Sequence, residues 1–401
     1  MLRLSPVSRF VGSVAAVCCL AAHTFADDLT VADRTASWVT QNQRSIVRQF
    51  NRAGVYGSIG TLGEGAGSGP GLAYFQPNVA GTPLDVYAGR AWSLDGDSLY
   101  DFRVGRIPHA PGHAPSRHRT LALLTPSLVE GADAPRFFAY AEMRRRSLVN
   151  GRLYGSESGA RPFAYEDHSY ELVLGHTLAP RLVASIRTGL LETRARLEPE
   201  RSSASLPADV RRPAGDRSFL ATTVSLAYDH RDRPRDPRNG TYVETSLARY
   251  HGTGPSSPSF DRFALDARQY LRLDSDRHVF ALRGLIDVAG GSGGDGVPFF
   301  LQPALGGSRS LRGFPRYRFR GPRVATLSAE YRWEVLRPFA LAAFYDAGRV
   351  WGGPAERGTG GIATSYGLGL VIKSKEGVLV RFDAAKGSEG MRLNVSFGHS
   401  F

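Results

Sequence analysis

The chain has 401 residues, a formal net charge of +13 and only two cysteines, Cys18 and Cys19. All but three of its 50 basic residues are arginine. No apolar run approaches the roughly 18 residues that a transmembrane helix needs, which argues against a helical membrane protein.

The first 26 residues are typical of a secretory signal. Arg3 and Arg9 give a positive start, residues 10–22 are apolar, and the small residues Thr24 and Ala26 predict cleavage after position 26. Both cysteines lie inside this signal, so the mature chain is expected to have no disulfide and no thiolate chemistry. Export argues against nucleic acid as a partner. An exported chain without membrane helices is either soluble or a transmembrane barrel.

Residues 27–67 are expected to form a short N-terminal helix and a glycine-rich linker. Between positions 28 and 51, apolar residues recur at helical spacing. This helix could rest on the mouth of a barrel, enter its lumen, or lie on the inner leaflet surface, and contact with the barrel is favoured. The segment is too short for an independent domain. Residues 54–71 are expected to be a flexible entry to the first strand.

The rest of the chain has the pattern of strands. Apolar and polar residues alternate with period two most clearly in 325–335, 378–385 and 391–401. In a soluble sandwich the apolar face would form the core. In a membrane barrel the apolar face meets lipid, and the charged face lines the lumen.

Connection lengths favour the membrane barrel. Tight links are expected at 178–180, 274–277, 336–338 and 374–377. Longer links rich in Gly, Pro and Ser are expected at 107–118, 148–162, 192–217, 252–260, 290–322 and 351–361. Short turns alternating with long loops are typical of periplasmic turns and extracellular loops. We therefore predict an all-β chain, with a 16-stranded antiparallel transmembrane β-barrel over residues 68–401, in the bacterial outer membrane with a periplasmic N-terminus.

The longest expected loop carries a specific pattern, Leu311-Arg312-Gly313-Phe314. It resembles the loop-six motif of the BamA/TamA superfamily of outer-membrane barrels, also called the bacterial surface antigen superfamily. Three further segments resemble that family in the same order. They are its periplasmic turn at 229–242, its Glu-bearing strand at 329–333 and its Phe-x-Asp-x-Gly strand at 344–348.

The resemblance implies that this extracellular loop folds inward and that Arg312 meets acidic residues on the lumen wall. By position in the motifs, the partners are Glu330 and Asp346. Strand parity agrees independently, because both carboxylates fall on the inward side of their strands. Gly313 allows backbone geometry that a side chain would block, and Phe314 fills lumen volume. The cluster could stabilise the barrel alone or also support a seam or gate.

The resemblance also implies a function in inserting or translocating proteins or lipids at the outer membrane. The terminal Phe401 resembles the signal by which the barrel assembly machinery recognises such chains. Well-known members carry POTRA domains, and 27–67 cannot hold one, so a separately encoded periplasmic partner is a further expectation. Arginine recognises phosphate, which makes outer-membrane lipids and lipopolysaccharide candidate partners, although GC-rich codon usage explains the arginines equally well. The alternative function is a plugged or anion-favouring pore.

No catalytic residue, metal site or cofactor is predicted. Ser68 is preceded by Ala66-Gly67, which lacks the first glycine of a nucleophile elbow. His109, His113 and His118 share one loop, and a solvated loop explains them better than a metal site.

Overall fold

The computed structural model describes residues 55–61, 68–93, 96–108, 136–154, 160–197, 215–233, 236–254, 256–291, 296–336, 338–352, 361–374 and 377–396. The expected signal, the N-terminal helix, the three loop histidines and Phe401 lie outside these ranges. No helix in this part of the chain is long and apolar enough to cross a membrane.

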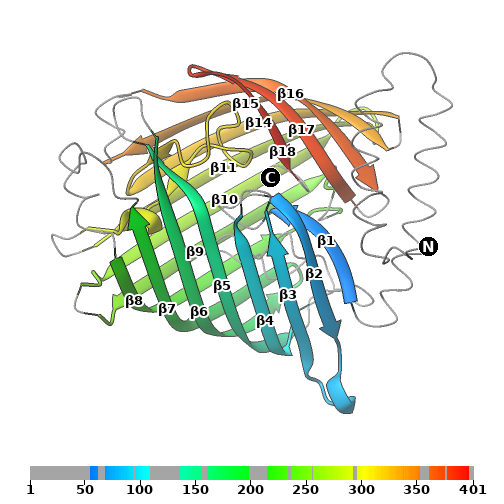
Figure 1. The fold of residues 1–401 in the computed structure, drawn as a ribbon. Coiled ribbons are helices and arrows are strands. Elements are labelled where there is room, and N and C mark those ends of the chain that lie inside the picture. The colour runs from blue at the N-terminus through cyan, green and yellow to red at the C-terminus, as the bar shows by residue number, and fades with distance from the viewer. Residues whose placement is uncertain are drawn as a thin grey trace, which may run out of the picture. The chain divides into compact units, whose positions relative to one another are not determined.

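The described residues form one large antiparallel sheet (Figure 1). Its sixteen strands follow one another in chain order, and each pairs with the next through hydrogen bonds. They are β1 Val55–Thr61, β2 Ser68–Gln76, β3 Asp85–Trp92, β4 Ser98–Arg106, β5 Phe137–Tyr154, β6 Ala160–Ala179, β7 Leu182–Leu197, β8 Gly215–Asp229, β9 Gly240–Gly252, β10 Phe260–Arg272, β11 His278–Gly290, β14 Arg323–Leu336, β15 Phe339–Trp351, β16 Ala363–Ser374, β17 Gly377–Gly387 and β18 Gly390–Ser396. No pairing joins β1 to β18 among the described residues, so these two strands are the edges of the sheet there.

The burial of the sheet is inverted relative to a soluble protein. On β14 the polar residues Ser328, Glu330 and Arg332 are buried, while Leu327 on the opposite face is 59% exposed. On β15, Asp346 is buried and its neighbour Tyr345 is 50% exposed. We call the face that carries Glu330 and Asp346 the inner face, and the other the outer face. An exposed apolar outer face over a buried charged inner face suits a sheet surrounded by lipid.

The sheet begins one strand earlier than expected. The predicted flexible entry at 54–71 is wrong, because β1 and the start of β2 lie within it and pair from Val55↔Tyr74 to Thr61↔Ser68. Glycines interrupt the apolar alternation there, but backbone pairing needs no side chains. The total of sixteen strands agrees with the prediction, but only fifteen of them lie within the predicted range of 68–401 in the described part of the chain.

The expected alternation of long and short links is only partly correct. The loop expected at 148–162 is mostly strand, because β5 continues to Tyr154 and β6 starts at Ala160, with a bulge between Leu148 and Gly151. Strand direction also places the long link between β4 and β5 at the end of the sheet that carries the tight β6–β7 turn. That end is the predicted periplasmic end.

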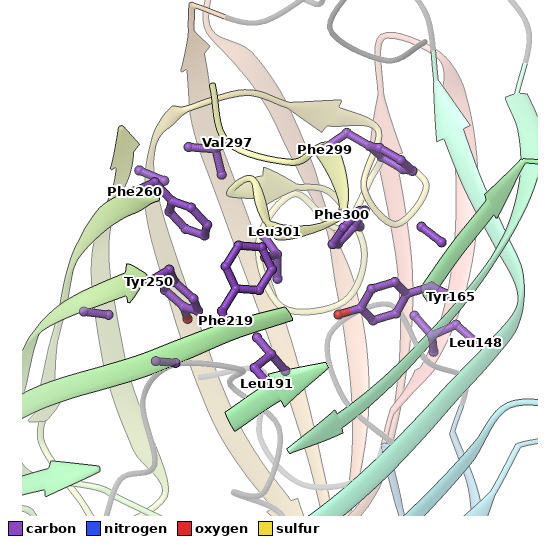
Figure 2. Packing of buried hydrophobic residues seen from close by; sticks show 14 of the residues in the cluster. Leu148, Tyr165, Leu191, Phe219, Tyr250, Phe260, Val297, Phe299, Phe300 and Leu301 are labelled. Atoms are coloured by element: carbon purple, nitrogen blue, oxygen red, sulfur yellow. The ribbon is translucent and has the colours of Figure 1, made fainter. Parts of the chain in front are cut away.

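The loop between β11 and β14 folds over the inner face. It contains the short helix η4 Phe299–Leu301 and a two-stranded ribbon of β12 Ala304–Leu305 and β13 Phe319–Arg320. Figure 2 shows Phe299, Phe300 and Leu301 among aromatic and aliphatic side chains of the surrounding strands. The Phe299 ring lies 5.3 Å from that of Phe163, at 75°. The loop therefore has an apolar core against the sheet, with the edge-to-face geometry that aromatic rings prefer.

Candidate functional site

The tip of this loop is a tight turn held by its own backbone. Gly306 and Gly307 have φ values of 120° and 85°, a region that favours glycine. The amide of Gly307 donates to the carbonyl of Phe314 at 3.0 Å, and the amide of Phe314 donates to the carbonyl of Leu311 at 3.1 Å. The turn presents Arg312 to the strands β14 and β15.

Arg312 meets both carboxylates assigned to it from the sequence. Its Nε donates to Asp346 Oδ2 at 2.9 Å and its Nη2 donates to Asp346 Oδ1 at 2.6 Å, a two-pronged geometry. Its Nη1 donates to Glu330 Oε2 at 2.5 Å. The guanidinium lies 3.5 Å from the centroid of the Phe344 ring. All three charged side chains are buried, with exposures of 0 to 1%.

The electrostatic environment keeps the Arg312 guanidinium charged. Burial alone would lower its pKa, but the hydrogen bond to Asp346 and the charges of Glu330 and Asp346 together raise its pKa above the ordinary value. Buried charges of this kind persist only when they are paired and hydrogen-bonded.

The sequence did not reveal two further arginines in the cluster. Arg381 of β17 donates two hydrogen bonds of 2.8 Å to Glu330, and its Nε donates to Asp383 at 2.8 Å. Arg332 of β14 donates to Glu330 at 2.7 Å. Three arginines thus meet the three carboxylates of Glu330, Asp346 and Asp383, and the charges balance. Period-two parity placed these residues on the inward side, but it gave no sign that β14 and β17 approach each other.

The residues that flank Arg312 fix the depth of the tip. A Cβ on Gly313 would lie 2.6 Å from the Gly387 nitrogen and 2.7 Å from the Ser365 Cβ, so only glycine fits. Phe314 is buried in an apolar cluster that joins the loop to the start of β14 and the end of β15. The other members of this cluster are Leu305, Leu311, Phe319, Val324 and Val350. These contacts place the tip against the backbone of β16 and β17.

The tip also touches the C-terminal edge strand. Asn394 of β18 donates from Nδ2 to the carbonyl of Arg312 at 2.9 Å. Arg318, further along the loop, donates to Glu389 in the turn before β18 at 2.5 Å. The loop therefore contacts every strand from β14 to β18, and its contacts extend to the edge strand of the sheet.

The β8–β9 turn, within the resemblance at 229–242, is bound to the same inner face. Arg238 donates to Glu334 of β14 at 2.6 Å, and Lys373 of β16 donates to Asp236 at 3.0 Å. Because Glu330 and Glu334 share one face of β14, the turn and the loop tip are attached to the same strand.

The arrangement of the cluster suits holding the loop in place rather than making or breaking covalent bonds. Each carboxylate accepts hydrogen bonds from arginine, and no reactive hydroxyl–imidazole pair accompanies them among the residues in view. The described ranges hold no group of three or more His, Cys, Asp and Glu side chains arranged for a metal ion.

Comparison with known proteins identifies the family. The sequence model of the Omp85 superfamily domain matches residues 146–401, which is more than half of the chain and includes the whole loop and its partners. The chain belongs to the Omp85 superfamily. Superfamily membership and the inverted sheet together imply an outer-membrane location.

Solved structures of the superfamily share the fold. BamA from Haemophilus ducreyi lacking POTRA domains 1–3 aligns with a TM-score of 0.61 at 15% identity, covering 86% of this chain and 68% of that one. CdiB from Escherichia coli aligns with a TM-score of 0.53 at 15% identity, covering 86% and 63%. A search of curated protein sequences finds no match to this chain.

Proposed function

We propose that the chain forms a closed sixteen-stranded barrel in the outer membrane, with β1 meeting β18, and inserts or translocates proteins or lipids there. Superfamily membership and the likeness to BamA and CdiB support this function. The barrel occupies residues 68–401 together with β1, its N-terminus is periplasmic, and a separately encoded partner supplies the client.

One observation carries the proposal. The loop tip is anchored through Arg312 on β14 and β15 and reaches the edge strand β18 through Asn394. A loop attached at the edge stabilises one side of the β1–β18 seam, which is where a client would leave the barrel sideways. Glu330, Asp346 and Arg381 act here as positioning residues, and Leu311 to Phe314 form the plug.

The second candidate is an anion-favouring pore lined by arginine. The packing of Phe299 and Phe300 against the inner face argues against a wide channel, because their apolar core occupies space that an ion path would need.

Single-channel recording separates these two functions. The purified full chain in a planar bilayer is expected to give small, brief openings, because the loop occupies the lumen. Arg312→Ala should lengthen the openings by releasing the tip. A large, steady, anion-selective current in the unaltered chain would contradict the proposal and support the pore.

A further inference from the structure

The outer face has an apolar groove across four consecutive strands. It has a volume of about 370 Å3 and is lined chiefly by Val104 of β4, Ala139 and Ala141 of β5, Leu172 and Leu174 of β6, and Ile186 of β7. The two alanines create the depression, because the residues before and after them on the same face of β5 are the larger, exposed Phe137 and Met143.

Exposed arginines surround the periplasmic end of this groove. Arg106 ends β4, two residues beyond Val104 and on the same face. Arg136 directly precedes β5, and Arg181 lies in the β6–β7 turn. Within the described part of the chain, none of the three forms an ion pair or side-chain hydrogen bond.

The opposite end of the same strands is different. There, two outer-face arginines are paired with carboxylates on neighbouring strands, Arg145 with Glu166 at 2.5 Å and Arg194 with Asp216 at 3.0 Å. The exposed Arg152 and Arg196 at that end form no ion pair among the described residues. Paired guanidiniums offer less positive field to a lipid phosphate than unpaired ones do.

Arg106, Arg136 and Arg181 lie two to five residues along the chain from residues that line the groove, whereas Arg152 and Arg196 lie eight or more away. The unpaired positive charge nearest the groove is thus at the periplasmic end.

We propose that this groove and its arginines bind an anionic glycerophospholipid of the periplasmic leaflet. An acyl chain lies against Ala139, Ala141 and Leu172, where it replaces the missing side-chain volume. The phosphate lies at Arg106, with Arg136 and Arg181 adding positive field; guanidinium groups suit phosphate because two N–H donors meet two oxygens. This site rests on the proposed membrane orientation.

Native mass spectrometry of the full chain in detergent tests the site, with dioleoylphosphatidylglycerol as the anionic probe and dioleoylphosphatidylcholine as the zwitterionic one. The chain should retain the anionic lipid preferentially. Arg106→Gln should lower that retention roughly fivefold, as expected for one basic residue near a lipid phosphate. Ala141→Phe fills the groove and should lower retention of both lipids.

Matched controls lie elsewhere on the outer face. Arg323→Gln removes an exposed arginine at the other end of the barrel, and Ala325→Phe enlarges an outer-face alanine of β14. Both should bind lipid as the unaltered chain does. Equal retention of the two lipids, or an equal loss in Arg323→Gln, would overturn the site. The site would also be overturned if lipopolysaccharide displaced the anionic lipid from the unaltered chain and this displacement required Arg106.

Failure of this site is distinguishable from failure of the proposed function. A chain that inserts into vesicles and migrates as a compact barrel, yet shows no preference for the anionic lipid, contradicts only the lipid site. A chain that does not insert contradicts the membrane barrel itself.

Discussion

An Arg312→Ala variant should lose its compact gel mobility at a temperature roughly 5–10 °C below that of the unaltered chain. Removing one partner of a buried ion pair costs about 3–5 kcal/mol, and less where water screens the charge that remains. Glu330 keeps Arg381 and Arg332. Among the described residues, Asp346 keeps only neutral donors, the hydroxyl of Ser365 and the backbone amide at position 312, both at 3.2 Å. The loss therefore falls mainly on Asp346.

Two comparisons make the Arg312 result specific. Arg272→Ala removes an exposed arginine that pairs with Asp276 at 2.7 Å, and exposed pairs contribute only about 0–1 kcal/mol, so its midpoint should barely move. The double variant Arg312→Ala/Asp346→Ala should fall by less than the two single losses together, because it leaves no unpaired carboxylate at that point. Strictly additive losses would show that the two side chains do not interact.

A Gly313→Val variant should displace the loop tip. Its side chain would meet the Gly387 nitrogen at 2.6 Å and the Lys386 carbonyl carbon at 2.8 Å, and backbone atoms inside a sheet do not move aside. Arg312 would then leave both carboxylates at once. We expect a fall in the melting midpoint at least as large as that of Arg312→Ala, together with longer openings in bilayer recordings.

Gly284→Val is the matched control for that variant. Gly284 is a glycine of β11 where an added Cβ would meet no atom within 4 Å, and valine suits a strand. Its midpoint and openings should stay unchanged. If Gly313→Val behaved like Gly284→Val, the tip would not be seated against β16 and β17.

Strand parity explains why the centre of the site was visible in the sequence. Side chains alternate between the two faces of a strand with period two. Once one charged residue is assigned to the inner face, the face of each remaining residue on that strand follows. That rule placed Glu330 and Asp346 inward, and the motif resemblance supplied Arg312 as their common partner. Strand parity and the motif resemblance both concern residues that lie on neighbouring strands or within one short sequence motif.

Contacts between strands that are not neighbours could not be predicted in this way. Arg381 reaches Glu330 from β17, and Asn394 reaches the Arg312 carbonyl from β18. These approaches depend on the curvature of the sheet and on the depth of the loop, which arise from many residues together. Alternation along one strand carries no information about either.

The apolar core beneath the loop was missed for a related reason. Phe219 and Phe260 are inner-face residues in the same apolar cluster as η4 (Figure 2). Phe163, also on the inner face, packs edge-to-face against Phe299 of η4. From sequence alone, apolar alternation was assigned to the lipid side, because nothing local shows that part of the inner face is covered by the chain itself. A long loop with three consecutive apolar residues, Phe299, Phe300 and Leu301, was the available signal.

The accessibility of the loop tip in intact cells tests the central claim most directly. The two cysteines of the chain lie in the expected signal, so a single engineered cysteine reports on its own position. Ser310→Cys, at a buried position beside Leu311, should resist a membrane-impermeant maleimide, whereas Ser256→Cys, at an exposed position between β9 and β10, should react. Adding Arg312→Ala should make Ser310→Cys reactive. Equal labelling of Ser310→Cys and Ser256→Cys in the otherwise unaltered chain would contradict a loop held inside by Arg312.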